Sequence, residues 1–290
     1  MNMRPETRKT KIFLDSGNPA DTKEALSVLG FLDGQTTNPS LVTKHPTLQQ
    51  KIAEGKKLSS AEINNFYKTI ITEISTFIPN GSVSIEVYAD ESTTAEEMIA
   101  QAREMYTWIP NAHIKFPTTK GGLGAAAMAI QTGMRVNMTL IFSPEQVAAV
   151  YAATKGAKKG DVFVSPFVGR LDDIGVDGMN FIQQCQELLH TGDGHVEVLV
   201  ASVRNMDHFL YSLALGADSI TAPLSLLKEW AAAGMPIPDA EMVYNRGEKK
   251  ALPPLSCDLT KPVDAYDITH PLTTKGIEKF VADWQALIGT

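Results

Sequence analysis

Ionisable side chains interrupt several short apolar segments of this sequence. Asp15 ends the segment KIFLD, Glu86 lies in VSIEVY and Lys115 lies in AHIKF. An uncharged lysine amine attacks a carbonyl carbon to form a Schiff base, and nearby carboxylates move the protons that this reaction releases and consumes. The combination therefore indicates covalent amine catalysis on a carbonyl compound, with Asp15 and Glu86 as acid–base groups.

Lys115 carries this hypothesis. Its neighbours Ile114 and Phe116 are apolar, and side chains alternate between the two faces of a strand. If these neighbours face outward, the amine points inward, where burial favours its uncharged form. A structural interpretation stays open, in which Lys115 reaches the strand end or forms an ion pair with Asp15 or Glu86.

Polar side chains also end most of the other apolar segments. These candidates for contact with a substrate are Thr36, Asn38, Asn137, Thr139, Ser165, Ser202 and Arg204. Arg204 and Ser202 precede a helical pattern over about residues 207–215, and a cation with a hydroxyl beside a helix N-terminus favours an anion. Arg170 adds a second positive charge, unless it pairs on the surface with a nearby aspartate.

Two further patterns are weak indications of a site. Asp172 and Asp173, the candidate surface partners of Arg170, form an acidic cluster with Asp177. No paired histidine accompanies them, so we interpret them as solvated loop charges and expect no metal site. The segment 121–124 (GGLG) matches a phosphate loop only loosely, and we interpret it as close helix packing.

Eight short apolar segments rich in β-branched residues alternate with helical patterns. We expect strands over residues 11–15, 31–36, 83–88, 112–116, 135–142, 162–167, 196–202 and 219–222. This alternation over roughly 220 residues predicts an α/β fold, a (β/α)8 TIM barrel, which gathers catalytic groups at the C-terminal ends of its strands. A doubly wound sheet is the alternative, but the turn Ser16-Gly17-Asn18-Pro19 lacks its glycine-rich fingerprint.

The whole chain, 1–290, is expected to form one barrel domain with its core over about residues 11–233. A polar segment at 44–80 and a proline-rich crossing at 234–272 exceed a minimal barrel. An extra C-terminal amphipathic helix follows, with apolar residues at helical spacing: Ile277, Phe280, Val281, Trp284, Leu287 and Ile288. This helix would cap its own barrel or that of a neighbouring subunit, and we expect a homo-oligomer.

The composition excludes several classes of protein. The sequence is 43% hydrophobic and 20% charged, which is typical of a globular chain. Its net charge of −7 argues against a nucleic-acid partner but not against small anions. The longest stretch without a charge, 121–134, is 14 residues long, which is too short to span a membrane.

The N-terminal residues and the two cysteines indicate the cellular compartment in which we expect the protein. The first ten residues are polar and lack an apolar signal core, so we expect a cytoplasmic protein. Cys185 and Cys257 have neither a disulfide framework nor metal-ligand spacing. We therefore expect both to be reduced, with Cys185 packed on a helix.

Five motifs, in order along the chain, resemble those of the transaldolase family. They are residues 33–41 (DGQTTNPSL), 114–117 (IKFP), 137–143 (NMTLIFS), 165–170 (SPFVGR) and 202–205 (SVRN). The resemblance runs from about residue 11 to 233 and includes the closing helix, whereas segments 44–80 and 234–272 depart from the family pattern.

The resemblance implies an enzyme of the pentose phosphate pathway that transfers a dihydroxyacetone unit between sugar phosphates. The donor would be sedoheptulose 7-phosphate or fructose 6-phosphate, and the acceptor erythrose 4-phosphate or glyceraldehyde 3-phosphate. Lys115 would form the imine, Asp15 would take the proton of the C4 hydroxyl, and Glu86 with a water on Thr139 would shuttle protons. Substrate contacts would come from Thr36, Asn38, Asn137, Ser165, Phe167, Arg170, Ser202 and Arg204, the two arginines and Ser202 at the phosphate. The iminium is the electron sink, so no metal or organic cofactor is implied.

Two alternatives stay open at this point. Fructose-6-phosphate aldolases, which release free dihydroxyacetone, resemble this chain but carry Gln at the position of Glu86 and Tyr at the position of Phe167. A phenyl ring cannot protonate the enamine, so this pair of residues favours transfer over cleavage. A non-catalytic sugar-phosphate-binding barrel would require the loss of Lys115, Asp15 or Glu86, and all three are present.

Overall fold

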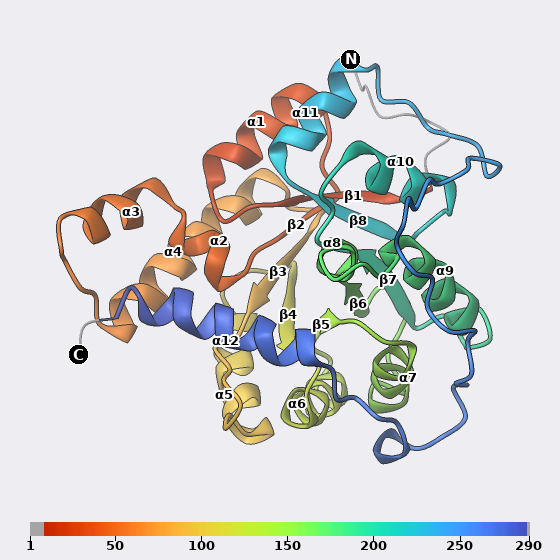
Figure 1. The fold of residues 1–290 in the computed structure, drawn as a ribbon. Helices are drawn as coiled ribbons and strands as arrows, with labels where there is room; N and C mark the ends of the chain where they lie inside the picture. Colours follow the sequence, from red (N-terminus) through yellow and green to blue (C-terminus); the bar gives the residue numbers. More distant parts are fainter. Residues whose placement is uncertain (1–8, 289–290) are drawn as a thin grey trace.

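A computed structural model describes residues 9–288 and confirms the predicted barrel. Eight parallel strands pair in sequence order, and β8 closes onto β1 (Figure 1). The strands are β1 Lys11–Asp15, β2 Gly34–Thr36, β3 Ser82–Glu86, β4 Ala112–Pro117, β5 Val136–Ile141, β6 Val162–Pro166, β7 Val196–Val200 and β8 Ser219–Ala222. All eight C-terminal ends therefore lie at the same end of the barrel.

Helices surround the strands, as Figure 1 shows. They are α1 Pro19–Leu29, α2 Pro39–Thr43, α3 Pro46–Ala53, α4 Ser60–Phe77, α5 Ala95–Tyr106, α6 Lys120–Gln131, α7 Pro144–Ala153, α8 Val168–Asp172, α9 Gly178–Leu189, α10 Met206–Ala214, α11 Leu224–Ala232, the 3-10 turn η1 Val263–Ala265 and α12 Pro271–Gln285. None of the helices within residues 9–288 is long and apolar enough to cross a membrane.

The helix starts follow from capping side chains. Thr94 and Glu97 form a reciprocal capping box at the start of α5. The Ser143 side chain accepts the Gln146 N–H at the start of α7, where Pro144 occupies the first turn. The Ser143 cap starts α7 directly after β5, whereas residues 87–94 separate β3 from α5.

Five of the expected strands, 31–36, 83–88, 135–142, 162–167 and 196–202, are longer than the observed strands. The expected strand 31–36 contains regular pairing only over β2, because the carboxylate of Asp33 accepts the Ile12 N–H before the strand begins. The expected strand 196–202 ends at Val200, and Ser202 lies beyond it in the left-handed region at φ 60°. Ser202 therefore belongs to a tight turn and not to the strand.

The glycine-rich segment at the start of α6 is a close packing contact, as expected. A Cβ on Gly122 would lie 1.9 Å from the carbonyl oxygen of Pro117, and one on Gly124 would lie 3.0 Å from the Cβ of Ala95. Cys185 is buried on α9, which confirms its predicted packing, and neither it nor Cys257 is in a disulfide.

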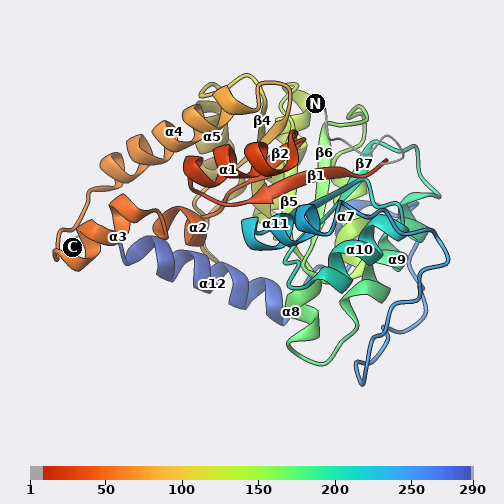
Figure 2. The ribbon, with the colours of Figure 1, turned by 90° about the horizontal axis from the view of Figure 1, so that it is seen from above.

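The terminal helix α12 caps its own barrel. It packs against α2 and β5, and Figure 2 shows it on the same side as α2 and α8, which follow β2 and β6. This side is the end where the strands finish. Of the two positions considered for this helix, the structure has the first, and the expected homo-oligomer stays a prediction.

At the opposite end of the barrel, His113 on β4 is buried in a polar and aromatic setting. Its Nε2 donates to the carbonyl oxygen of Gly160 at 2.9 Å, and its Nδ1 accepts from the Ser82 hydroxyl at 2.8 Å. The ring stacks on Phe163 with centroids 4.4 Å apart. Burial, which disfavours the charged ring, lowers the pKa of His113 from 6.5 to about 3.

This pKa predicts an acid-dependent loss of stability. The unfolded chain binds a proton at His113 below its ordinary value of 6.5, whereas the folded chain does not until about 3. The stability contribution is therefore complete above that ordinary value and falls as pH decreases, by about 1.4 kcal/mol per pH unit. We expect His113→Gln, measured by urea unfolding at several pH values, to show a correspondingly shallower loss.

The matched control is His190→Gln, because His190 is exposed at the end of α9. This variant should lose stability with the slope of the parent chain. Equal slopes for the parent and His113→Gln would show that His113 is not the group responsible.

Candidate active site

A cavity of about 220 Å³ opens at the C-terminal ends of the strands, under α12. It is lined by Asp15, Thr36, Asn38, Ser40, Leu41, Lys44, Lys115, Ser165, Phe167, Arg170, Ala201, Ser202, Arg204, Thr221, Lys279 and Phe280. Most of the candidate residues thus converge on one space. Asn137, Thr139 and Glu86 lie outside this lining and are buried in the barrel interior.

Lys115 points into the barrel, as strand alternation predicts, since Ile114 and Phe116 belong to the outer apolar core. Its Nζ lies 3.0 Å from Oε2 of Glu86 and donates to the carbonyl oxygen of Thr37 at 3.1 Å. The Lys115 and Glu86 side chains are each only 4% exposed. The ion pair considered from the sequence is therefore present with Glu86, and it holds the amine at the wall of the cavity.

Glu86 and Thr139 are buried polar groups near Lys115. Within residues 9–288, Oγ1 of Thr139 has no hydrogen-bond partner, and Oε2 of Glu86 is in contact with the Lys115 amine. Burial raises the pKa of Glu86, and the charge of Lys115 opposes this rise. Glu86 is the register partner of Lys115 on β3, and Asn137 is its register partner on β5, with Thr139 two residues further along that strand.

Asp15 forms a second acid–base position on the other side of the cavity. The Thr36 hydroxyl donates to its Oδ1 at 2.7 Å and lies 2.6 Å from the Thr221 hydroxyl. Burial raises the pKa of Asp15, and the Thr36 hydrogen bond and Lys115 act in the opposite direction. A carboxylate with a raised pKa is suited to accepting a proton during turnover.

The side-chain amides of Asn38 and Asn137 form hydrogen bonds with neighbouring residues of the protein. Oδ1 of Asn38 accepts the Leu41 N–H at 2.9 Å and caps α2. Asn137 donates to the Ser84 hydroxyl at 3.0 Å and accepts from Ser165 at 2.7 Å. The structure therefore brings Asn38 and Ser165 to the cavity and places Asn137 beneath Ser165.

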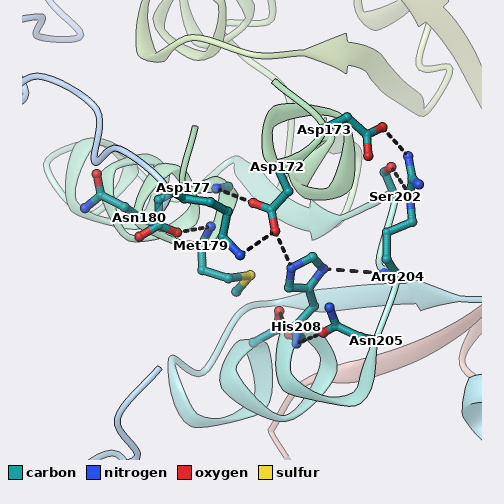
Figure 3. Close-up of polar contacts among 12 residues, drawn as sticks. Asp172, Asp173, Asp177, Met179, Asn180, Ser202, Arg204, Asn205 and His208 are labelled. Carbon is teal, nitrogen blue, oxygen red and sulfur yellow. Dashed lines mark hydrogen bonds and ion pairs between the residues drawn. The ribbon is translucent and has the colours of Figure 1, made fainter. Parts of the chain in front are cut away.

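Two arginines meet at the mouth of the cavity. Gly169 lets α8 approach the turn after β7, because a Cβ there would lie 2.4 Å from the carbonyl oxygen of Ser202. The guanidinium of Arg204 pairs with Asp173 at 2.8 Å, whereas that of Arg170 lies over the ring of Phe167 (Figure 3 shows the Arg204 pair). The surface ion pair considered for Arg170 is therefore not formed.

The aspartates after α8 correct a sequence-based interpretation. Asp177 is buried and caps α9, where its side chain accepts the Met179 and Asn180 N–H groups. Asp172 accepts the Gly178 N–H at 3.0 Å and pairs with His208 at 2.9 Å, as Figure 3 shows. Of the three aspartates, only Asp173 is exposed. The expectation that all three are solvated loop charges was therefore wrong for Asp172 and Asp177. These two carboxylates accept hydrogen bonds from backbone N–H groups, and Asp172 also pairs with His208.

Several residues of the site were missed by the sequence analysis. The cavity also contains Thr221, Lys44, Lys279 and Phe280. The hydroxyl of Tyr67, on the buried face of α4, accepts the Glu86 N–H at 3.0 Å and lies 2.6 Å from the Thr37 hydroxyl. Tyr67 thus contacts both residues that hold Lys115. Its apolar helical spacing indicates only a core position, so the sequence contains no signal for this contact.

Comparison with known proteins agrees with this geometry. Residues 12–290 match the family described as Transaldolase/Fructose-6-phosphate aldolase. A "Probable transaldolase" of Methanococcus maripaludis is 36% identical over 95% of this chain and 98% of its own length. Proteins of the same name from Thermoplasma volcanium and Lactiplantibacillus plantarum are each 34% identical, over 95% and 97% of this chain and 95% and 99% of their own lengths.

The family match includes the two segments that depart from the expected pattern, since it extends through the proline-rich crossing to the end of the chain. The relatives are similar over nearly their whole length. This chain belongs to the transaldolase/fructose-6-phosphate aldolase family.

Proposed function

We propose that this enzyme is a transaldolase that moves a dihydroxyacetone unit from a ketose phosphate to an aldose phosphate through an imine on Lys115. The position of that amine carries the proposal: it is buried in the barrel, touches Glu86 and lines a cavity whose mouth contains Arg170 and Arg204. Sedoheptulose 7-phosphate or fructose 6-phosphate is the donor. Erythrose 4-phosphate or glyceraldehyde 3-phosphate is the acceptor.

Imine formation requires proton transfers around the lysine. The Lys115 amine attacks C2 of the ketose, and the carbonyl oxygen leaves as water after it has gained two protons. In this proposal Glu86 delivers and removes these protons, with Thr139 holding the water that relays them. The contact of the buried Oε2 of Glu86 with the Lys115 amine, and the Oγ1 of Thr139, which has no hydrogen-bond partner among the described residues, support this assignment.

Bond cleavage requires a base near the sugar chain. In this proposal Asp15 takes the proton of the C4 hydroxyl, the C3–C4 bond breaks, and its electron pair moves into the iminium to give an enamine. The aldose phosphate leaves, and the enamine carbon attacks the aldehyde of the acceptor. The raised pKa of Asp15 supports its role as the group that accepts and returns this proton.

The substrate contacts follow from the same cavity. Thr36, Asn38 and Ser165 would contact the hydroxyls of the dihydroxyacetone unit, with Asn137 orienting Ser165 from below. The phosphate would lie against Ser202, Arg170 and Arg204. Phe167 would keep the enamine without a nearby proton donor, which favours transfer over release of free dihydroxyacetone; the aldolase alternative is not favoured.

The proposal also covers the domain organisation of the chain. The packing of α12 against α2 and β5 supports one barrel domain that includes the terminal helix. The cytoplasmic location and the homo-oligomer stay predictions.

Removal of the amine should abolish the reaction. We expect Lys115→Ala to lower kcat by at least about a thousandfold, because Lys115 is the buried amine beside Glu86, whereas the other lysines of the cavity lining, Lys44 and Lys279, are exposed. Incubation of the parent enzyme with fructose 6-phosphate and borohydride should give a stable mass adduct on the Lys115 peptide. Lys11→Ala is the control, since Lys11 pairs with Glu197 at the other end of the barrel. Adduct formation in Lys115→Ala, or full turnover, would rule out the imine on this residue.

Replacement of Glu86, the proposed proton shuttle, should change the ratio of transfer to release as well as the rate. We expect Glu86→Gln to slow imine steps by about a hundredfold and to raise free dihydroxyacetone relative to transfer product. The measurement is product analysis from fructose 6-phosphate with and without erythrose 4-phosphate. Glu197→Gln, a buried glutamate paired with Lys11, should leave the ratio unchanged. A constant transfer-to-release ratio in Glu86→Gln would contradict the assignment.

The acid limb of the kcat/KM–pH profile should follow the ionisation of Asp15. The base must be ionised, so kcat/KM should fall as pH decreases through the raised pKa of Asp15, above its ordinary value of 3.8. Thr36→Val removes the hydrogen bond that lowers this pKa, so the acid limb should move to higher pH. Thr22→Val is the control, because that buried hydroxyl donates to Gln35 outside the cavity. An unmoved acid limb in Thr36→Val would assign the limb to another group.

A further inference from the structure

The terminal helix α12 reaches the cavity as well as capping the barrel. Figures 1 and 2 show it crossing the barrel end from near α8 to near α3. Lys279 and Phe280 of this helix line the cavity together with Lys115 and Arg170. The helix therefore contributes surface to the site itself.

Phe280 and Phe167 hold the guanidinium of Arg170 between them. The guanidinium carbon lies 5.1 Å from the ring centroid of Phe167 and 5.6 Å from that of Phe280. Within residues 9–288 this side chain has no ion pair, unlike Arg204, which pairs with Asp173. The face of an aromatic ring attracts a guanidinium. The N–H donors at the edge of the guanidinium, which point outward in its own plane, stay available to an anion.

Gly276 lets α12 approach the guanidinium of Arg170 closely. A Cβ at this position would lie 2.7 Å from Nη1 of Arg170 and 2.6 Å from Cδ2 of Leu140. Any larger residue would push the helix or the guanidinium away. Gly276 and Phe280 lie one helical turn apart, so the same face of α12 approaches Arg170 at two points.

Side-chain hydrogen bonds anchor one end of α12 to β5 and the other end to α2. The Thr273 hydroxyl donates to the carbonyl oxygen of Leu140 at 2.9 Å and accepts from Gln146 at 2.9 Å. Leu140, directly after Thr139, has the left-handed φ of 60°. Toward the other end, the Ser40 hydroxyl donates to Asp283. These contacts fix the height of Phe280 above the cavity.

We propose that α12 sets the preference of this enzyme for phosphorylated sugars, with Phe280 as the positioning residue that holds Arg170 ready for the substrate phosphate. The inference rests on the proposed function for the location of the phosphate. A free arginine loses rotamer freedom when it binds an anion, whereas one already held between two rings loses less. Loss of the Phe280 ring should therefore weaken phosphate binding without changing the chemistry at Lys115.

The test compares Phe280→Leu with the parent enzyme on paired acceptors. We expect the KM for glyceraldehyde 3-phosphate to rise on the order of tenfold, while kcat and the kcat/KM for unphosphorylated glyceraldehyde stay the same. Phe280→Tyr keeps the ring face and should restore the parent value. Leu287→Ala is the control, because Leu287 is buried just beyond the C-terminal end of α12, where its carbonyl oxygen accepts the Leu58 N–H.

A binding measurement makes the test independent of turnover. Calorimetric titration with inorganic phosphate should give a Kd on the order of tenfold weaker in Phe280→Leu and unchanged in Leu287→Ala. Gly276→Ala should weaken phosphate in the same direction, and it provides a second variant if Phe280→Leu does not fold.

Equal losses for both acceptors, or an unchanged phosphate Kd in the folded variants, would overturn the proposal. The proposed function fails by a different result, namely the absence of a borohydride-trapped adduct on Lys115 in the parent enzyme.

Discussion

The contact between Lys115 and Glu86 inside the barrel is the constraint on which the site depends. Burying two opposite charges is costly, and a protein recovers this cost only where the pair is close and further contacts satisfy the remaining donors. Here the amine has two partners, Glu86 and the carbonyl oxygen of Thr37, and the Tyr67 hydroxyl contacts both partner residues. The lysine is thereby held in one place, with its nitrogen at the cavity wall.

The closed ring of parallel strands turns this single contact into a site. Neighbouring strands place Glu86, Lys115 and the region of Thr139 side by side, and β1 brings Asp15 to the opposite wall. Acid–base groups with raised pKa values therefore lie on both sides of one amine. In the proposed function, this separation would let Glu86 act on the imine and Asp15 on the carbon chain of the sugar.

The entrance is built from segments that are distant in sequence. Gly169 brings α8 against the turn at Ser202, so Arg170 and Arg204 converge, and α12 adds Phe280 from near the end of the chain. The two arginines are held differently, one by a carboxylate and one by aromatic rings. An anion would have to compete with Asp173 for Arg204 but would find Arg170 without an ionic partner among the described residues. In the proposed function, Arg170 would therefore be the stronger determinant of phosphate binding.

The barrel, and the candidate residues that the structure brings together in one cavity, were readable in the local pattern, because strand alternation acts over a few positions. The segment around Lys115 predicted an inward amine from its two apolar neighbours alone, and the order of five motifs indicated the family. Contacts between distant segments were decided only by the tertiary structure: Tyr67 against Glu86, Phe280 against Arg170, and Asp172 against His208. A tyrosine or phenylalanine at helical spacing has the same pattern whether it fills a core or orders a functional side chain, because periodicity specifies a face and not the residue that meets it.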